Sequence, residues 1–307
     1  MGPHKSTKCI PPRGASLWRA HAPNISYERC FEVKQIKRAC KYMLILGLIV
    51  ILVHVVSCLT LDKRIEYKEI SFDSAKAPAE MDGYKIVLIT DTHAITAQEL
   101  ENVVIRINRW ETDLLILGGD FPSGIEALKR SMEILSKIET TDGIYGVEGN
   151  HDNHIELFAA MGQYSMHPLS NSGARIRERF YLAGVEDLWN RSPNVEKAIQ
   201  QAHADDFVLL VSHNPDVTMK QDTTTVDLIL SGHTHGGHIT FFGIWAPALT
   251  LRNSITDYGQ RFLSGWAVSR DGVPVYVSHG AGTFENIPRV FARPQVILIT
   301  LRAAGNP

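Results

Sequence analysis

The sequence is 307 residues long and 44% hydrophobic, so it is large enough to bury a substantial core. Its formal net charge of -2 conceals an asymmetry, because residues 1–41 carry nine Lys or Arg against two Glu and the remainder has a net charge of -9. That acidic remainder argues against a nucleic-acid-binding surface, so no nucleic-acid partner is expected. The four cysteines, Cys9, Cys30, Cys40 and Cys58, all precede Thr60, which excludes disulfides and thiolate metal ligands from the region after it.

Residues 42–61 form an uncharged apolar run, YMLILGLIVILVHVVSCLTL. Twenty residues of helix at about 1.5 Å each span roughly 30 Å, the thickness of the hydrocarbon core of a bilayer. We therefore predict a transmembrane helix over residues 42–61, with a basic tail over 1–41, a linker and entry strand over 62–84, and the main domain over 85–307. The bilayer itself is the first expected partner.

Two targeting alternatives stay open. VVSC at residues 55–58 is similar to a bacterial lipobox, in which Cys58 would be lipidated after cleavage, but a lead of 41 residues is long for a signal peptide. Either route tethers the same domain on the same side of the membrane. MGPHKS at the start fits a loose myristoylation pattern, which a spanning helix makes unnecessary.

Beyond the linker, short apolar runs alternate with segments of helical periodicity. Strands are predicted at 85–90, 113–117, 143–148, 207–211 and 227–230, with helices at 97–110 and 125–138. This alternation predicts an α/β fold with largely parallel pairing. The strands end in DTH, GGD, GNHD, SHNPD and SGHTHGGH, and in such folds ligands gather beyond the carboxyl ends of the strands.

The last of these segments holds three histidines among glycines. His233 and His235 are two residues apart, so in an extended segment their side chains point to the same side. Neutral imidazole is the commonest metal ligand in proteins, and the flanking glycines allow the backbone to approach an ion closely. The spacing therefore favours one metal ion or two adjacent ions.

Taken in order, the five motifs resemble the calcineurin-like metallophosphoesterase superfamily over roughly residues 85–300. That resemblance implies a β-sandwich of two mixed sheets flanked by helices. The single anchor, the SHNPD wording and the tail YVSHGAGTFENIPRVFARPQV are similar to a membrane-associated branch that includes bacterial UDP-2,3-diacylglucosamine pyrophosphatases.

The resemblance also implies two divalent metal ions, with Mn, Fe, Zn or Co as candidates. In the family's pattern one ion would be held by Asp91, His93 and His235, the other by Asn150, His213 and His233, and Asp120 would bridge them.

The same pattern assigns acid catalysis to the GNHD motif. His151 would protonate the leaving oxygen, with Asp152 orienting its ring. A helix N-cap is the alternative role for Asp152.

Two positions depart from the family pattern. The first motif here is TDTH where Ser-Asp-Leu/Ile-His is more common, and His238 stands where the last motif often has Gln. We expect His238 to be a strand-edge residue, with contact to substrate or to the metal ligands as the alternative. His154, His167 and His203 have no motif around them and are expected at the surface.

The leading function is hydrolysis of a phosphodiester or pyrophosphate bond, with an amphiphilic, lipid-linked substrate such as UDP-diacylglucosamine as the nearest example. Residues 239–251, ITFFGIWAPALTL, provide an apolar loop where hydrocarbon could lie, although Ile239 and Phe241 are expected in core strand packing. Arg289 and Arg293 could hold phosphates or lie at the surface. Alternatives are a phosphoprotein or nucleotide phosphatase and a non-catalytic membrane-tethered scaffold, which would be expected to lose ligand residues.

The flanking charges generate a prediction about topology. Lys34, Lys37, Arg38 and Lys41 precede the apolar run, so the N-terminus should stay in the cytoplasm and the region after residue 61 should lie outside. Protease added to intact spheroplasts should digest that region. Protection of the region, with digestion only after lysis, would contradict the orientation.

Overall fold

The computed structural model describes residues 25–250, 255–284 and 287–303. Most of the predicted basic tail, including Cys9 and the myristoylation pattern, and residue 251 of the apolar segment lie outside the described residues. The chain divides into two units, residues 1–52 and 53–307, and each is described by itself.

Helix α1 (Ile25–Leu59) covers residues 42–59 of the predicted span 42–61 and begins well before Tyr42. The segment Glu32–Lys63, which runs from α1 past its end, is long and apolar enough to cross a membrane by length and composition. Leu44, Leu46 and Leu48 are each more than half exposed, as expected of side chains that would face lipid. A short 3₁₀ turn, η1 (Leu61–Lys63), follows the helix.

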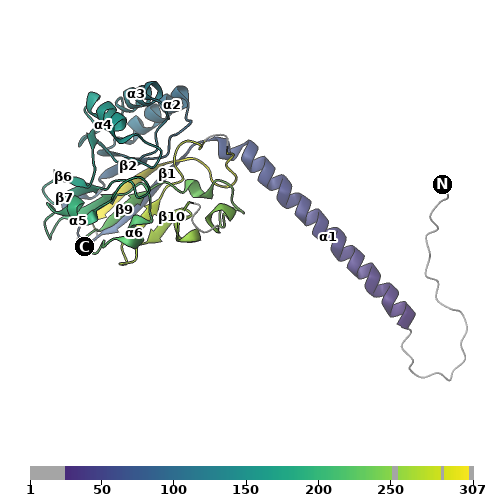
Figure 1. The fold of residues 1–307 in the computed structure, drawn as a ribbon. Coiled ribbons are helices and arrows are strands. Elements are labelled where there is room, and N and C mark those ends of the chain that lie inside the picture. Colours follow the sequence, from purple (N-terminus) through teal and green to yellow (C-terminus); the bar gives the residue numbers. More distant parts are fainter. Residues whose placement is uncertain (1–24, 251–254, 285–286, 304–307) are drawn as a thin grey trace, which may run out of the picture. The chain divides into compact units, whose positions relative to one another are not determined.

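The second unit contains two six-stranded mixed sheets (Figure 1). The strands of the first sheet lie in the order β1 (Glu66–Ser74), β12 (Gln295–Ala303), β2 (Lys85–Ile89), β3 (Leu114–Leu117), β4 (Ile144–Gly146) and β5 (His167–Pro168). Those of the second lie in the order β10 (Gly265–Val268), β11 (Pro274–Val277), β9 (Leu228–Ser231), β8 (Phe207–Val211), β7 (Phe180–Gly184) and β6 (Ser172–Arg177). Only β12–β2, β10–β11 and β6–β7 pair antiparallel among the described strands, which confirms the largely parallel prediction.

Side chains along each strand point alternately to the two faces of its sheet, and both faces are apolar here. The two sheets therefore pack face to face through one face each. Leu88 of β2, Leu209 of β8 and Leu230 of β9 belong to one fully buried cluster between the sheets. Their neighbours along the strands, such as Ile89 and Leu210, point to the opposite faces and enter other clusters. The architecture is a β-sandwich.

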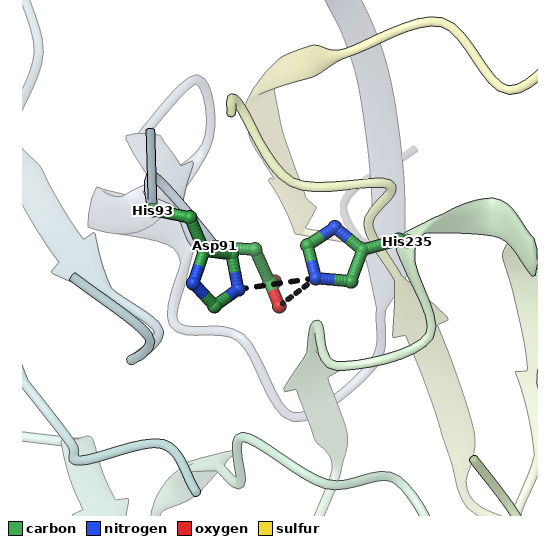
Figure 2. A group of neighbouring side chains, drawn as sticks. All are labelled: Asp91, His93 and His235. Atoms are coloured by element: carbon green, nitrogen blue, oxygen red, sulfur yellow. Dashed lines mark hydrogen bonds and ion pairs between the residues drawn. The ribbon is translucent and has the colours of Figure 1, made fainter. Parts of the chain in front are cut away.

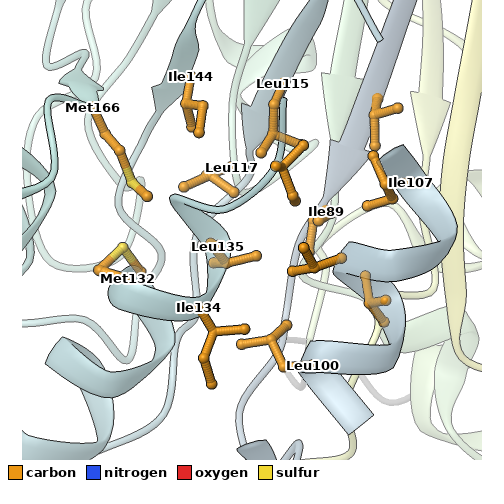
Figure 3. Packing of buried hydrophobic residues seen from close by; sticks show 14 of the residues in the cluster. Ile89, Leu100, Ile107, Leu115, Leu117, Met132, Ile134, Leu135, Ile144 and Met166 are labelled. Carbon is orange, nitrogen blue, oxygen red and sulfur yellow. The ribbon is translucent and has the colours of Figure 1, made fainter. Parts of the chain in front are cut away.

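Helices cover the outer faces of both sheets, where their apolar stripes complete two further cores. Against the first sheet lie α2 (Ala97–Ile107), α3 (Ile125–Leu135) and α4 (His154–Gln163), and Figure 3 shows the packing of this layer. Against the second lie the shorter α5 (Val195–Ile199) and α6 (Val217–Lys220). The predicted fold class, an α/β sandwich of two mixed sheets flanked by helices, is confirmed.

The layer between the sheets generates a stability prediction. Leu209→Ala should lower the free energy of unfolding by about 2–5 kcal/mol, because Leu209 is fully buried there and its removal leaves a cavity. Ile155→Ala is the control, since Ile155 is 78% exposed and its loss should change stability by less than about 0.5 kcal/mol. Chemical denaturation of both variants measures the free energy of unfolding. An equal loss in the two variants would contradict the assignment of Leu209 to the central core.

Candidate metal centre

Five loops at the carboxyl ends of parallel strands bring the predicted metal ligands together. The loops follow β2, β3, β4, β8 and β9. Six of the seven ligand residues are buried and Asn150 is partly buried; the six are Asp91, His93, Asp120, His213, His233 and His235. These side chains come from both sheets, so the site depends on the packing of the sandwich.

The first predicted group, Asp91, His93 and His235, is compact (Figure 2). The Nε2 atoms of His93 and His235 are 3.2 Å apart, and His235 Nε2 lies 3.4 Å from Asp91 Oδ1. Three donor atoms therefore converge on one point, as they would around a single cation.

Asp120 lies between this group and the next. Its Oδ2 atom is 3.3 Å from Nε2 of His93 and 3.3 Å from Nε2 of His213. Asp91, Asp120 and His213 also place one donor atom each within 4.8 Å of one another. Asp91 thus lies close to both donor groups, whereas the family resemblance assigned it to only one of the two metal ions.

His233 and Asn150 form the remaining corner. Nδ1 of His233 lies 2.8 Å from Oδ1 of Asn150, and the His213 and His233 rings are 5.2 Å apart. His233 and His235 therefore reach different parts of the cluster, which agrees with the arrangement that the family resemblance implies.

The donor set fits divalent cations. Nδ1 of His213 donates a hydrogen bond to the Gly118 carbonyl at 2.7 Å, which leaves Nε2 as the bare nitrogen facing the carboxylates. That Nε2 atom is buried and makes no hydrogen bond of good geometry among the described residues, although it lies 3.3 Å from Asp120 Oδ2, so a metal ion beside Asp120 would be within its reach. Carboxylate oxygen and imidazole nitrogen suit Mn, Fe, Zn or Co.

Burial and mutual contact shift the pKa values of the carboxylates and of His213 in this cluster. Burial raises the pKa of Asp91. Burial opposes ionisation of Asp120 as well, but the adjacent His213 and His93 outweigh it and hold the Asp120 pKa well below its usual range. Burial lowers the pKa of His213, yet the Asp120 and Asp91 carboxylates outweigh that effect and raise it to about 10. A proton on His213 and a metal ion therefore compete for the same place.

The outer imidazoles are held neutral. Burial, reinforced by His213, lowers the pKa of His233 to about 3. Burial and then the Arg289 guanidinium hold the pKa of His235 well below its usual range. Neutral imidazole is the form that binds metal, so both residues are ready to act as ligands near neutral pH.

Backbone conformation at the site departs from the ordinary. Left-handed φ angles, which are uncommon for residues other than glycine, occur at five of the predicted ligands: Asp91, His93, Asp120, His233 and His235. Gly149 and Gly232 pass so close to Asp120 and Asp91 respectively that a Cβ at either position would collide with the carboxylate. Local strain of this kind concentrates at functional sites and is maintained by the surrounding fold.

Asp152 has a different role from the predicted one. Its Oδ2 accepts from the backbone amides of Asp120 and Gly149, each at 2.8 Å, and its Oδ1 accepts from Phe121 at 2.9 Å. Both carboxylate oxygens therefore hold the Asp120 and Gly149 loops together, so the prediction that Asp152 orients the ring of His151 is wrong. The N-cap alternative is also wrong, because Asn153 caps α4.

His151 lies at the mouth of the site. Its backbone amide donates to Asp120 Oδ1 at 2.8 Å, while its ring is exposed and lies 4.7 Å from the ring of Phe284. It also lines a cavity of about 220 Å³ that opens onto the donor cluster. The imidazole is free of the carboxylate contacts that hold His93 and His213, which suits proton transfer to a bound substrate.

Apolar residues form much of the cavity wall. Trp189, Ile255, Phe284 and Ile287 line it together with the predicted ligands, and Trp189 packs edge-on against His233 with ring centroids 4.6 Å apart. Sequence reasoning missed these four residues. Phe284 and Ile287 fall within the tail that carried the family resemblance, but nothing near Trp189 in the sequence marks it.

Arg289 and Arg293 do not face the cavity as phosphate ligands. Arg289 is 2% exposed, and its guanidinium lies 3.1 Å from Nδ1 of His235 and donates to the carbonyls of His235 and His279. Arg293 donates to the carbonyl of Arg64 at 2.7 Å. Arg289 thus holds His235 in place and Arg293 contacts the linker, so the predicted phosphate grip is wrong for both. The alternative of a surface position is wrong for Arg289, whereas Arg293 is partly exposed.

Two predictions next to the last motif also need correction. His238 lies in a turn with a φ of 55° and stacks on His235 with ring centroids 4.4 Å apart, so it is a wall of the cavity and not a strand-edge residue. Ile239 and Phe241 are exposed, although core packing was expected for them.

The three histidines outside the motifs divide into two cases. His167 and His203 are exposed, as predicted. His154 is only partly exposed and makes a close contact with the buried carboxylate of Glu148.

The sequence profile of the calcineurin-like phosphoesterase family matches residues 84–237, half of the chain. The chain belongs to this family. It is a metal-dependent phosphoester hydrolase, and the family and the donor set together imply divalent metal ions. The profile covers the loops that carry all seven predicted ligands.

Several curated proteins are similar to the chain. An uncharacterized metallophosphoesterase YkuE from Bacillus subtilis is 28% identical over 262 residues, covering 78% of this chain and 87% of that protein. An uncharacterized metallophosphoesterase from Helicobacter pylori is 28% identical, covering 69% of this chain and 58% of that protein. A transmembrane protein with metallophosphoesterase domain from Danio rerio is 26% identical, covering 75% and 55%. The chain thus spans little more than half the length of the last two.

A solved structure of a dimetal phosphatase from Danio rerio is also similar, with a TM-score of 0.40 and 13% identity over 65% of this chain and 88% of that one.

Substitutions of the predicted metal ligand Asp120 and of the predicted acid His151 should have different effects. Asp120→Ala should lose bound metal and activity, because Asp120 lies between both donor groups. His151→Ala should keep metal and lose about 10²-fold to 10⁴-fold in rate. His167→Ala, an exposed histidine in β5, is the control and should keep both. Elemental analysis beside turnover measures this, and a His151→Ala protein empty of metal would overturn the division of roles.

Proposed function

We propose that the chain is a membrane-tethered, two-metal hydrolase of a phosphodiester or pyrophosphate bond in an amphiphilic substrate. The observation that carries the proposal is the combination of a donor cluster with an apolar cavity wall, formed by Trp189, Ile255, Phe284 and Ile287. A cavity built only to hold a phosphate would be expected to present polar groups, whereas apolar walls favour a substrate with hydrocarbon next to its phosphorus.

The predicted ligands would hold two cations in separate positions. Asp91, His93 and His235 would hold one cation, Asn150, His213 and His233 the other, and Asp120 both. When bound, the cations would neutralise the phosphoryl oxygens and lower the pKa of an attacking water.

The reaction would form one bond from water oxygen to phosphorus, with loss of a water proton to solvent, and break the bond to the leaving oxygen. The exposed imidazole of His151, in its protonated form, would give a proton to that leaving oxygen and so reduce the negative charge that builds on it as the bond breaks. Asp152 keeps the Asp120 and Gly149 loops in place through its three backbone hydrogen bonds. Arg289 holds the ring of His235 from behind.

A second cavity supports a lipid-linked substrate. It has a volume of about 390 Å³, lies beside the end of α1 at Cys58, and reaches Ala281, Thr283 and Ile287. Ile287 lines both cavities, and the second also has the charged residues Asp62, Lys63, Glu99 and Arg289 in its wall. An acyl chain that enters from the membrane would pass Ile287 while its head group lies at the metals.

The tether is the other support. The apolar helix would hold the domain at the membrane surface, with the N-terminus inside and the domain outside, where an amphiphile is concentrated and a soluble nucleotide is not. One relative is a transmembrane protein with the same domain. UDP-diacylglucosamine is the nearest named example of such a substrate. Arg289 is buried against His235, so it does not provide a contact for the diphosphate of such a molecule.

Substrate preference tests the proposal. A long-chain lipid pyrophosphate in detergent micelles should have a kcat/KM more than about tenfold above that of its deacylated head group, because burying two methylenes contributes about 1.6 kcal/mol. Trp189→Ala should reduce this ratio, while Trp266→Ala, a substitution of an exposed tryptophan in β10, should not. Equal kcat/KM for both substrates in the wild type would refute acyl-chain recognition, and a preference for a nucleotide or phosphopeptide would redirect the assignment.

A further inference from the structure

Residues 239–245 form an exposed apolar loop, named here the interfacial loop. Its exposed large side chains are Ile239, Phe241, Phe242, Ile244 and Trp245. Ile244 is 77% exposed and Trp245 45% exposed, so the loop presents several apolar groups to its surroundings without burying them in the core. Contiguous exposed apolar surface on a protein marks a contact with a partner or a membrane.

The interfacial loop has a defined conformation. Phe241 donates to the Trp245 carbonyl at 2.7 Å, which closes the loop on itself. The backbone and hydroxyl of Thr240 both bond to the Val290 carbonyl, and Gly243 donates to that hydroxyl at 2.8 Å. The apolar side chains are thus held outward by hydrogen bonds at the base of the loop.

An aromatic cluster joins the loop to the end of α1. The ring of His54 lies 5.4, 4.7 and 4.9 Å from the rings of Phe241, Phe242 and Phe291. His54 belongs to residues 53–59, the part of the helix that lies in the same structural unit as the loop. Around it on the helix, Val55, Val56 and Leu59 are exposed.

The buried carboxylate of Asp62 reinforces this junction. It accepts a hydrogen bond from Ser57 Oγ at 2.7 Å and another from the Phe291 amide at 2.9 Å. One side chain therefore links the last turn of the helix to the aromatic cluster. The interfacial loop and the end of α1 form one continuous apolar surface.

We propose that this surface, made of the interfacial loop, Phe291 and residues 53–59, inserts into the lipid bilayer where the helix leaves it. Tryptophan and phenylalanine favour the boundary between head groups and hydrocarbon, and the burial of such groups there is favourable. Lys63 and Arg64 follow within one short turn of the end of the helix, where they could contact lipid head groups. The inference rests on the proposed membrane tether and not on the proposed hydrolysis.

The bilayer fits this surface better than the hydrocarbon of a substrate does. The described walls of the two cavities beside the donor cluster and the helix end are made by other residues, so the loop does not face a bound substrate. The loop is instead continuous with the apolar helix, which the membrane would already surround. A second copy of the chain is the other partner that could cover this surface, and the test below distinguishes it from the bilayer.

Insertion would place the metal site at the lipid surface. His238, which stacks on His235, directly precedes the loop, and Arg289, which holds His235, is two residues from Phe291. Two short segments thus connect the membrane contact to the same metal ligand. The cavity would open close to the head groups, where the phosphorus of an amphiphile lies.

The test uses tryptophan fluorescence of the full chain in lipid nanodiscs with one chain per disc, without substrate. Lipids brominated on their acyl chains should quench the wild-type emission. Trp245→Phe should lose most of the quenchable emission, because Trp245 would be in contact with the bilayer. Trp266→Phe is the matched control, since Trp266 is similarly exposed at 47% but packs against Phe72 and Tyr276 elsewhere on the domain, and its loss should leave the quenching unchanged.

The outcomes distinguish the possible failures. A chain that does not enter nanodiscs would refute the tether itself. A chain that enters them but shows the same quenching in Trp245→Phe as in the wild type would refute the inserted surface alone. Protection of Trp245 from an aqueous quencher only when several chains share a disc, with no quenching by brominated lipid, would assign the surface to a second copy. Since none of these readouts involves turnover, failure of the proposed hydrolysis would leave the result intact.

Discussion

Two buried carboxylates, Asp91 and Asp120, share one edge of the sandwich with four imidazoles, and the surrounding structure holds this arrangement in place. Burying carboxylates is costly unless positive charge lies beside them. The imidazole of His213 supplies that charge as a proton, which is why its pKa rises to about 10. Divalent cations would supply it more completely by displacing that proton, because Nε2 of His213 faces the carboxylates that would bind them.

Holding such a cluster requires a rigid frame, and the sandwich provides one. Strands β2 and β3 of one sheet and β8 and β9 of the other end at the same edge, with a continuous apolar layer between the sheets. That layer offsets the strain of left-handed backbone at five ligand positions. Backbone contacts from Asp152 and the Gly118 carbonyl then fix the loops and the orientation of one imidazole.

The same edge of the domain contacts residues 53–59 at the end of α1. Arg289 holds His235, while Phe291, two residues later, packs on His54 of α1. A short segment therefore links a predicted metal ligand to the helix end. In a tethered enzyme this connection would keep the cavity at a constant height above the bilayer, so that an amphiphile could reach the metals without leaving the membrane completely.

The sequence by itself predicted five central strands, two of the covering helices and the seven candidate ligand positions, because apolar periodicity and strand-end polar residues are local properties of the chain. It also placed the apolar helix from its length and lack of charge. It could not determine what Asp152, Arg289 or His238 contact, since each role depends on segments far away in the sequence. Asp152 reaches the loop of Asp120, and Arg289 lies behind a histidine 54 residues earlier. Trp189 enters the cavity wall only because its loop packs on His233, and Phe241 packs on His54 of the helix end instead of in the core. Tertiary packing alone decided these features, because contacts between distant segments leave no pattern in either segment alone.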